Sequence, residues 1–424
     1  MQEDFLHHVW LHKKFALESL YTTDHQPIVI KSVGIPNSNS GPDFFNAQIY
    51  IDHQLWGGNV EIHVQSSDWY VHHHEQDPAY DNVILHVVWT HNSEVFRADN
   101  SVVPTLALQP YVSAQLLENY LSLKANKNQW IPCAPQFPLV NKFEILNWLE
   151  RLYFERLEHK FKPLQQQLIA THQDWEAVMF WQLARAFGTK VNADAFWSVA
   201  KSFPFSVFRK IQNNPMQMEA LLFGQSGLLD ADVEDSYFRD LKRTYDFLKQ
   251  KYQLSNDGVL PLKFFRLRPP NFPTIRLAQL VQLYHKNAHL FSKLMQAHSY
   301  PELQDLLSGE TSDFWRIHYT FKKSSNEKTK PISKSFVDLL IINAILPMRY
   351  AYHMVKGLDQ EDIISIIKAI PSEQNAIVKA FNALKPIAKT ALESQALIEL
   401  KNNYCDQFKC LQCGIGSVLL NRNA

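Results

Sequence analysis

Residues 41–69 read GPDFFNAQIYIDHQLWGGNVEIHVQSSDW, and this stretch decides the fold. Apolar and polar residues alternate through 43–52 and again through 55–65, which is the period of a strand that buries one of its faces. A short turn joins the two segments, so we expect a pair of neighbouring strands. Asp43 and Glu61 stand inside this alternating pattern, which raises the question of whether the chain is an enzyme.

Glu61, His63 and Gln65 point to one face of the second strand, because successive side chains of a strand alternate between its faces. Asp43 opens the first strand, so its carboxylate can approach Glu61. Two carboxylates at the end of a strand form a hard-oxygen site that suits Mg²⁺ or Mn²⁺. Such an ion polarises a phosphoryl oxygen, and a neighbouring His can act as a base. The alternative is that the acids cap turns and His63 is hydrogen-bonded on a surface strand.

The surrounding sequence predicts an α/β arrangement in the N-terminal part of the chain. Strand-like segments follow an initial stretch of helical spacing and are interrupted once by a helical connection. The expected elements, in chain order, are a helix in 3–20, strands in 27–35, 43–52 and 55–65, a helical connection, and strands in 82–89 and 105–109.

With this order of elements the sequence resembles the PD-(D/E)XK nuclease-like phosphodiesterases, whose core runs helix, three strands, helix, strand. Members of that group carry an Asp, often after Pro, at the start of the second strand and a Glu-x-Lys motif on the third. Pro42-Asp43 and Glu61-Ile62-His63 occupy those places here. The sequence departs from the pattern at His63, which lacks the permanent positive charge of the expected Lys.

The resemblance implies a restriction-endonuclease-like mixed sheet, flanked by helices, in residues 1–135. It implies that Asp43 and Glu61 bind Mg²⁺ or Mn²⁺. It also implies a catalytic role for His63 in place of the Lys that positions or activates the attacking water. Gln65 matches a polar residue that some members place just beyond the motif.

The chain as a whole also resembles members of an uncharacterised bacterial family of the domain-of-unknown-function type. The segments that carry this resemblance are GPDFFNAQI, GNVEIHV, SDW, NVILHVVW, RPPNFPTIRLAQ and CLQCGIG. Because that family has no established activity, the resemblance implies common ancestry and adds no function.

Histidines are concentrated near the acidic pair, since 11 of the 18 lie within the first 100 residues. His86 lies in the segment NVILHVVW, and it can be a further metal ligand or phosphate contact if that strand neighbours the Glu-x-His strand. His72 or His74 can approach the ion from the helical connection, and His7 and His8 stand on the first helix. The alternative for each single histidine is a surface or hydrogen-bonded residue.

The later sequence has helical periodicity with Pro and Gly mostly at the joints, so we expect a large all-α domain over 136–424. Residues 1–140 hold six Lys and Arg against 14 Asp and Glu, a net charge of −8, and the remainder holds 36 against 28, a net charge of +8. A basic part suits a polyanion such as DNA or RNA, although an ordinary solvated surface also explains this charge.

Arg266, Arg268 and Arg276 surround a Pro-rich turn in which Phe residues are interleaved. Arg with aromatic residues suits phosphate contacts and base stacking, so these three are candidate nucleic-acid-binding residues. The alternative is a turn that joins helices, with its Phe residues packed inside and its Arg residues paired with acids.

The four cysteines are Cys133, Cys405, Cys410 and Cys413. The last three follow a Cys-x4-Cys-x2-Cys spacing that allows one metal or cluster, and Cys133 is the remaining candidate for a fourth ligand. The pattern resembles the iron–sulfur staples of some helicase-associated and CRISPR-associated nucleases, although their triplet spacing differs. We therefore expect a 4Fe–4S cluster or Zn²⁺ at this second site, with buried or unpaired thiols as the alternative.

These observations predict a metal-dependent nuclease or related phosphodiesterase that acts on nucleic acid. Two alternatives remain, a catalytically inactive nuclease-like scaffold that binds nucleic acid or protein, and a His-rich metal enzyme acting on a small molecule. No Walker or Rossmann glycine motif is present, which disfavours an ATP motor or a dinucleotide enzyme. The chain lacks a signal-peptide pattern and a bilayer-spanning apolar run, so we expect a cytoplasmic protein without membrane attachment.

Overall fold

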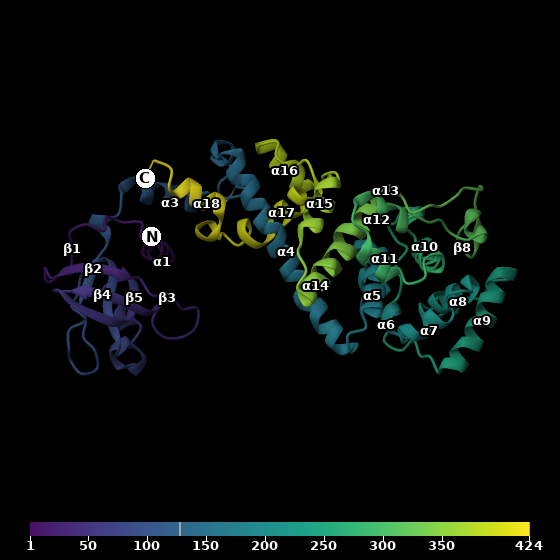
Figure 1. Cartoon of the computed structure of the whole chain (residues 1–424), viewed down its shortest axis with the longest axis horizontal. Coiled ribbons are helices and arrows are strands. Elements are labelled where there is room, and N and C mark those ends of the chain that lie inside the picture. The colour runs from purple at the N-terminus through teal and green to yellow at the C-terminus, as the bar shows by residue number, and fades with distance from the viewer. Residues whose placement is uncertain (127–128, 424) are drawn as a thin grey trace. The chain divides into compact units, whose positions relative to one another are not determined.

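The computed structural model describes residues 1–126 and 129–423. The chain divides into two compact units (Figure 1). Unit 1 comprises Met1–Trp148, Ala380–Pro386 and Ile398–Ala424, and unit 2 comprises Leu149–Lys379 and Ile387–Leu397. The end of the chain therefore folds with the N-terminal part, so the three C-terminal cysteines belong to the same unit as the sheet.

Unit 1 contains a mixed β-sheet in which the strands follow the order β1-β2-β4-β5-β6-β7, with β3 paired to β4. Strand β4 is antiparallel to β2 and β5, whereas β6 is parallel to β5 and β7. The elements up to the end of the sheet are α1 Glu3–Leu11, β1 Leu20–Tyr21, β2 Pro27–Ser32, β3 Ile35–Pro36, β4 Phe44–Ile51, β5 Gln54–Gln65, α2 Asp68–Val71, η1 His74–Gln76, η2 Pro78–Tyr80, β6 Val83–Thr90 and β7 Thr105–Ala107. The remaining elements of unit 1 are η3 Gln109–Tyr111, α3 Ala114–Ala125, η4 Phe137–Leu139, η8 Leu400–Cys405, η9 Cys410–Gln412 and α18 Gly414–Leu420.

Helix α1 packs against strand β5 and covers part of one face of the sheet. Its apolar residues recur at helical spacing, and Phe5, Val9 and Trp10 are fully buried. Burial of side chains of this size stabilises the fold by about 1.5–3 kcal/mol each. The indole of Trp10 also donates a hydrogen bond to the Val33 carbonyl oxygen at 3.1 Å. These contacts fix α1 next to the strand that carries Glu61.

A bulge in β4 shapes the end of the strand that Asp43 precedes. Phe44 pairs with Val60 but Ala47 pairs with Gly58, so β4 contains one extra residue between these two pairs. A bulge bends the strand and re-aims nearby side chains. The bend therefore sets the direction in which the chain enters β4.

The connection between β5 and β6 is short and helical, as the sequence predicted. Helix α2 and the turns η1 and η2 enclose a small core around Trp69, whose indole donates to the Phe96 carbonyl oxygen at 3.1 Å. His73 lies between α2 and η1 with a φ of 60°, a left-handed conformation that reverses the local direction of the chain. The reversal brings residues on both sides of His73 toward β5.

Unit 2 is helical apart from the ribbon β8-β9. Its helices are α4 Lys142–Ala170, α5 Trp175–Phe187, α6 Thr189–Lys201, α7 Phe205–Lys210, α8 Pro215–Gln225, α9 Ser236–Tyr252, α10 Pro273–Lys286, α11 Leu290–Gln296, α12 Tyr300–Leu306, α13 Lys334–Leu340, α14 Leu346–Lys356, α15 Glu361–Ala369, α16 Ala376–Leu384 and α17 Ala391–Glu399. Shorter elements are η5 Pro269–Asn271, η6 Asp313–Arg316, η7 Ile341–Ile345, β8 His318–Thr320 and β9 Lys323–Ser324. Helices α4, α16 and α17 cross the division between the units.

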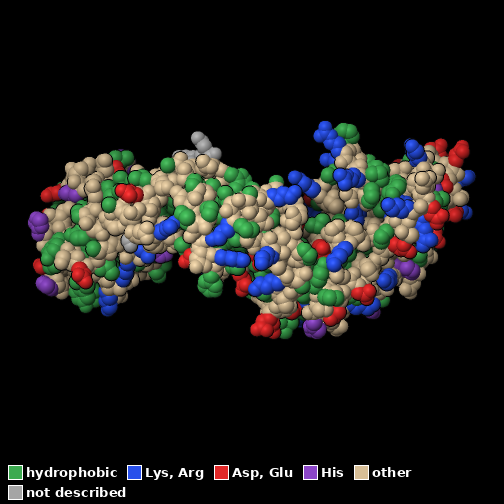
Figure 2. All heavy atoms as spheres, turned by 90° about the horizontal axis from the view of Figure 1, so that it is seen from above, with side chains coloured by type: hydrophobic (Ala, Val, Ile, Leu, Met, Phe, Trp, Pro, Cys, Tyr) green, Lys and Arg blue, Asp and Glu red, His purple; other side chains and the backbone are tan. Residues whose placement is uncertain are grey.

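The mixed sheet in the N-terminal part and the many helices after it confirm the coarse order expected from the sequence. On the face drawn in Figure 2, Lys and Arg side chains are numerous over the helical part of the chain. Within the described ranges, no helix combines the length and apolar character needed to cross a bilayer.

Candidate metal centre

Asp43 and Glu61 meet at the start of β4, as the sequence predicted that they could. The backbone N–H of Asp43 donates to Glu61 Oε2 at 3.1 Å. In return, the N–H of Ile62 donates to Asp43 Oδ2 at 3.0 Å. This reciprocal pair of hydrogen bonds fixes both carboxylates, because charged acceptors form the stronger bonds with backbone donors.

Three imidazoles gather beside Glu61. His63 Nε2 and His74 Nε2 lie 3.6 Å and 3.1 Å from Glu61 Oε1. His63 Nε2 also lies 3.0 Å from His72 Nδ1, and one nitrogen from each of the three histidines falls within 4.8 Å of the other two. We call Glu61, His63, His72 and His74 the metal centre.

The donor set of the metal centre fits an ion. In a tetrahedral site with metal–nitrogen bonds of about 2.1 Å, neighbouring ligand atoms lie about 3.4 Å apart. The observed separations of 3.0, 3.1 and 3.6 Å scatter around that value. His74 Nε2 is buried and makes no well-aligned hydrogen bond within the described chain, although it contacts Glu61. A bound ion would accept the lone pair of this nitrogen and so supply the partner that it lacks.

His86 lies behind His63 rather than in the group of three. The parallel pairing of β5 and β6 places Glu61 opposite His86. Nε2 of the fully buried His86 then lies 2.8 Å from His63 Nδ1. Metal-bound histidines usually use their second nitrogen in such a hydrogen bond, which orients the ring. The contact leaves His63 Nε2 directed at the metal centre.

Burial sets the protonation of this cluster. It lowers the pKa of His63 to about 3, with contributions from His74 and His72, and it lowers that of His86 well below the usual value. Both rings are therefore neutral near pH 7, the state in which an imidazole can bind a metal. Burial raises the pKa of the Glu61 carboxyl; the contact with His74 opposes this shift and the charge of Asp43 adds to it.

His7 and Asp43 form a second layer that faces a cavity. His7 Nε2 lies 3.2 Å from Asp43 Oδ2. Burial lowers the pKa of His7, but the contact with Asp43 outweighs burial, so the net pKa is raised. Both residues line a cavity of about 450 Å³ that also exposes Lys124 and Lys409. Asp4 also lines this cavity, and its Oδ2 lies 2.8 Å from Lys124 Nζ.

Gln65 is exposed at the end of β5, and its side-chain oxygen accepts a hydrogen bond from Asn92 at 3.3 Å. This hydrogen bond joins Gln65 to the segment after β6 rather than to the imidazoles. The Asn92 contact could not be predicted from the sequence, because Asn92 lies beyond the next strand, β6. His72 and His74, by contrast, stood out as part of the run HHH.

The four cysteines lie in unit 1. Cys133, Cys405 and Cys413 are buried and Cys410 is partly buried. Burial raises the pKa of each thiol, and the neighbouring thiols add to the shift for Cys133 and Cys405. Across residues 1–126 and 129–423, no three thiol sulfurs fall within 4.8 Å of one another. The cysteines are neighbours, but they are less closely grouped than the imidazoles.

The three candidate arginines differ in exposure. Arg266 and Arg268 are exposed on the Pro-rich turn, and the Arg266 guanidinium lies 5.2 Å from the centre of the Phe265 ring. Arg276 lies in the first turn of α10 and is only 7% exposed. Arg276 therefore cannot contact a large nucleic acid in the way that the exposed pair can.

Residues 3–376 match the family described as "Protein of unknown function (DUF2851)". The chain belongs to this family. The match confirms the resemblance to a family of unknown function and assigns no chemistry to it. No curated protein and no solved structure matches the chain.

Proposed function

We propose that unit 1 is a metal-dependent phosphodiesterase that acts on DNA or RNA, on a restriction-endonuclease-like variant of the α/β fold. The observation that carries this proposal is the convergence of one carboxylate and three imidazole nitrogens at spacings close to those of a tetrahedral site. Asp43, hydrogen-bonded beside Glu61, supplies the second carboxylate expected of such an enzyme. We place the protein in the cytoplasm.

The choice of ion follows from the donors. The sequence alone favoured Mg²⁺ or Mn²⁺ with Asp43 and Glu61 as ligands. Imidazole nitrogens suit Zn²⁺ or Fe²⁺, and carboxylates suit Mn²⁺ or Mg²⁺. Three imidazoles with one carboxylate therefore favour Mn²⁺ or Zn²⁺ over Mg²⁺. When bound, such an ion polarises a phosphoryl oxygen and lowers the pKa of a bound water.

The residues of the chain provide orientation and proton transfer. His86 holds the His63 ring in place through Nδ1. Asp43 Oδ2 lies 3.2 Å from His7 Nε2, and this contact raises the pKa of the His7 ring, which favours its protonated form. His7 at the 450 Å³ cavity can therefore protonate the leaving oxygen as a general acid. In this scheme the four residues of the metal centre, Glu61, His63, His72 and His74, bind the ion.

Metal analysis of the full chain, purified without oxygen, tests the proposed centre. We expect one Mn²⁺ or Zn²⁺ per chain, lost in His74→Asn because a central nitrogen donor is removed. His73→Asn is the matched control, since His73 is exposed and Asn tolerates its positive φ. Wild-type protein that binds neither ion on titration would refute the centre. Iron or zinc beyond this stoichiometry would support a second site at Cys133, Cys405, Cys410 and Cys413.

Cleavage of a panel of DNA and RNA substrates with Mn²⁺, Zn²⁺ or Mg²⁺ tests the activity. We expect Glu61→Gln to reduce the rate by at least about tenfold, because the amide is a poorer metal ligand. A wild-type chain that binds the ion and nucleic acid but cleaves nothing would instead indicate a catalytically inactive scaffold.

A second candidate function is a His-rich metal enzyme acting on a small molecule. The observation that favours it is the predominance of imidazole over carboxylate around the centre. The 450 Å³ cavity has the volume of a small-molecule site, about 300–1,000 Å³. Hydrolysis of a small phosphodiester such as bis-p-nitrophenyl phosphate, without cleavage of any nucleic acid, would favour this alternative.

A further inference from the structure

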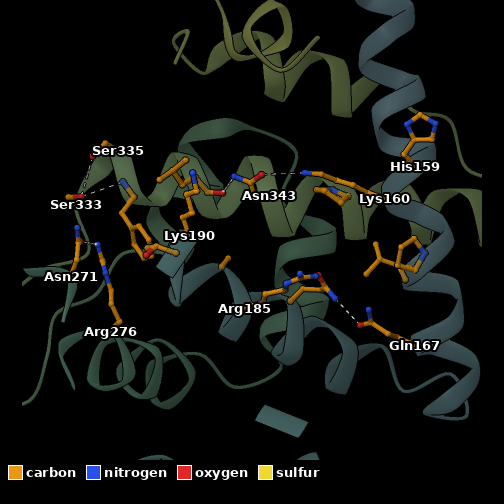
Figure 3. Close-up of a pocket in the computed structure, with 18 residues that line it drawn as sticks. His159, Lys160, Gln167, Arg185, Lys190, Asn271, Arg276, Ser333, Ser335 and Asn343 are labelled. Atoms are coloured by element: carbon orange, nitrogen blue, oxygen red, sulfur yellow. Dashed lines mark hydrogen bonds between the residues drawn. The ribbon is translucent and has the colours of Figure 1, made fainter. Parts of the chain in front are cut away.

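A cavity of about 880 Å³ lies within unit 2, where helices α4, α5, α6, α10 and α13 contribute to its walls (Figure 3). Its volume falls within the range of small-molecule and cofactor sites, about 300–1,000 Å³. All of its lining residues belong to unit 2, so it shares none with the metal centre of unit 1. The cavity is therefore a candidate binding site separate from the metal centre.

Arg276 is the buried cation of this cavity. It is only 7% exposed, and its guanidinium donates to Gln279 Oε1 at 2.8 Å and to Asn271 Oδ1 at 2.6 Å. The guanidinium carbon lies 3.5 Å from the centre of the Phe336 ring. These partners are all uncharged. In the described part of the chain, Arg276 has no carboxylate partner, and its Nε has no hydrogen-bond acceptor.

An unpaired buried charge is costly, because water is removed without a counter-ion to replace it. Burial lowers the pKa of Arg276 to about 10, so the side chain is still charged at neutral pH. The amide oxygens and the ring orient the guanidinium but leave its net charge uncompensated. An anion that enters the cavity would supply the missing partner.

The walls add positive charge. Lys160 from α4, Arg185 from α5 and Lys190 from α6 line the cavity together with Arg276 (Figure 3). Among the described residues that line it, none is Asp or Glu. Arg185 also pairs with the exposed Asp194 at 3.2 Å, outside the lining. A concave surface with charges of one sign focuses the electrostatic potential and attracts ligands of the opposite sign.

The local fold explains how these cations come together. Gly188 alone separates α5 from α6, and a Cβ at this position would lie 2.4 Å from the Asn192 carbonyl oxygen. The tight connection places the last turn of α5 next to the first turn of α6, so Arg185 and Lys190 reach the same cavity. Asn343 in the π-helical turn η7 also lines the cavity and accepts a hydrogen bond from Lys160 at 3.3 Å. Such turns are frequent at functional sites.

The cavity also has an apolar part. Phe336, Leu164 and Leu339 line it alongside the cations. A flat ring can pack against such side chains while a phosphate group meets the guanidinium, and Arg binds phosphate oxygens through its forked donors. The combination of cations, an aromatic ring and this volume matches a nucleotide better than a bare inorganic anion.

We propose that this cavity binds a nucleotide, with its phosphate at Arg276 and Lys190 and its base against the apolar wall. The nucleotide can be a free mononucleotide or the 5′-phosphorylated end of a short oligonucleotide, since both present the same chemistry. The site is independent of the phosphodiesterase proposed for unit 1. The two proposals can therefore fail separately.

Calorimetric titration of the full chain, with a chelator present to silence the metal centre, tests the proposal. The probes are AMP, adenosine, inorganic phosphate and a trinucleotide with or without a 5′-phosphate. We expect AMP to bind at least about tenfold more tightly than adenosine or inorganic phosphate. A preference for the 5′-phosphorylated trinucleotide over AMP would show that the ligand is the 5′ end of an oligonucleotide and not a free mononucleotide. Equal binding of AMP and adenosine, or no binding of any phosphate ester at low salt, would overturn the proposal.

Charge reversal locates the site. Lys190 is exposed, so Lys190→Glu should preserve the fold. The same change should lower the affinity for AMP about tenfold or more. Lys242→Glu, an exposed change on α9 outside the cavity, is the matched control and should bind as wild type does. Equal weakening by both changes would show unspecific attraction and contradict the proposal. Arg276→Gln, accepted only if its thermal unfolding stays cooperative, should abolish the preference for AMP over adenosine.

Discussion

Buried histidines are the residues on which the chemistry proposed for unit 1 depends. His63 and His86 are almost fully buried, and burial lowers the pKa of both rings. A neutral ring presents a lone pair to a metal, whereas a protonated ring does not. The same burial makes the fold sensitive to acid, because the unfolded chain binds protons that the folded chain excludes.

His8 allows this sensitivity to be measured away from the metal centre. Burial lowers its pKa to about 4, with smaller effects from His12 and Lys14, against a usual value of 6.5. Its contribution to stability is therefore complete above pH 6.5 and is lost as the pH falls toward 4. We expect His8→Gln to show a shallower fall in melting temperature between pH 7 and 4 than wild type, measured by differential scanning calorimetry. Exposed His25→Asn is the control, and an identical slope for His8→Gln and wild type would contradict the argument.

At the scale of elements, the β4 bulge determines where Asp43 lies. Gly34 packs against this bulge with a φ of 94°, and a Cβ there would lie 2.7 Å from the Phe45 carbonyl oxygen. A side chain at Gly34 would therefore strain the backbone and displace the bulge. Because the N–H of Asp43 bonds to Glu61, such a displacement would reach the metal centre.

Gly34→Ala should accordingly destabilise the protein and weaken metal binding together. We expect a loss of more than about 1 kcal/mol in the free energy of unfolding, as for other glycines with positive φ. Metal affinity should fall in the same variant, as measured by competition with a chromogenic chelator. Gly57→Ala is the matched control, since a Cβ there meets nothing within 4 Å. Wild-type metal affinity in Gly34→Ala would show that the bulge does not position the centre.

The strands could be predicted from the sequence because their alternation is local. The segments expected at 43–52 and 55–65 correspond to β4 and β5 within two residues. The shared face of Glu61 and His63 followed from the same period. The helix expected in 3–20 is shorter, since α1 ends at Leu11 and Lys13 has a φ of 49°. The approach of His72 to His63 and of His74 to Glu61 depends on a chain reversal at His73, which spacing alone does not encode.

At the scale of the whole molecule, features formed by residues far apart in the chain could not be predicted from the sequence. Residues 398–424 fold with the sheet although 136–424 read as one helical domain, because helical periodicity does not indicate which unit a helix joins. The 880 Å³ cavity draws on helices far apart in the chain, so no local motif marks it. The charge division, −8 for residues 1–140 and +8 for the rest, was by contrast visible in the sequence.

That charge division predicts where a polyanion should bind. Arg266 and Arg268 are exposed on the Pro-rich turn of the basic part, so both can contact phosphates. We expect the full chain to bind single-stranded DNA with an affinity that falls as salt rises, because phosphate contacts release counterions. The double variant Arg266→Glu and Arg268→Glu should weaken binding about tenfold or more and reduce the salt slope.

Fluorescence anisotropy at several salt concentrations measures both the affinity for single-stranded DNA and the dependence of that affinity on salt. Lys242→Glu with Lys249→Glu is the matched control, because both lysines are exposed on α9 and their reversal changes the net charge of the chain equally. If the two double variants weaken binding to the same extent, net charge rather than the Pro-rich turn attracts the DNA. If the wild type does not bind at low salt, nucleic acid is not the partner of the basic part. A selective loss in the arginine variant would place the phosphate contacts on the turn, where the exposed Arg266 lies beside the exposed ring of Phe265.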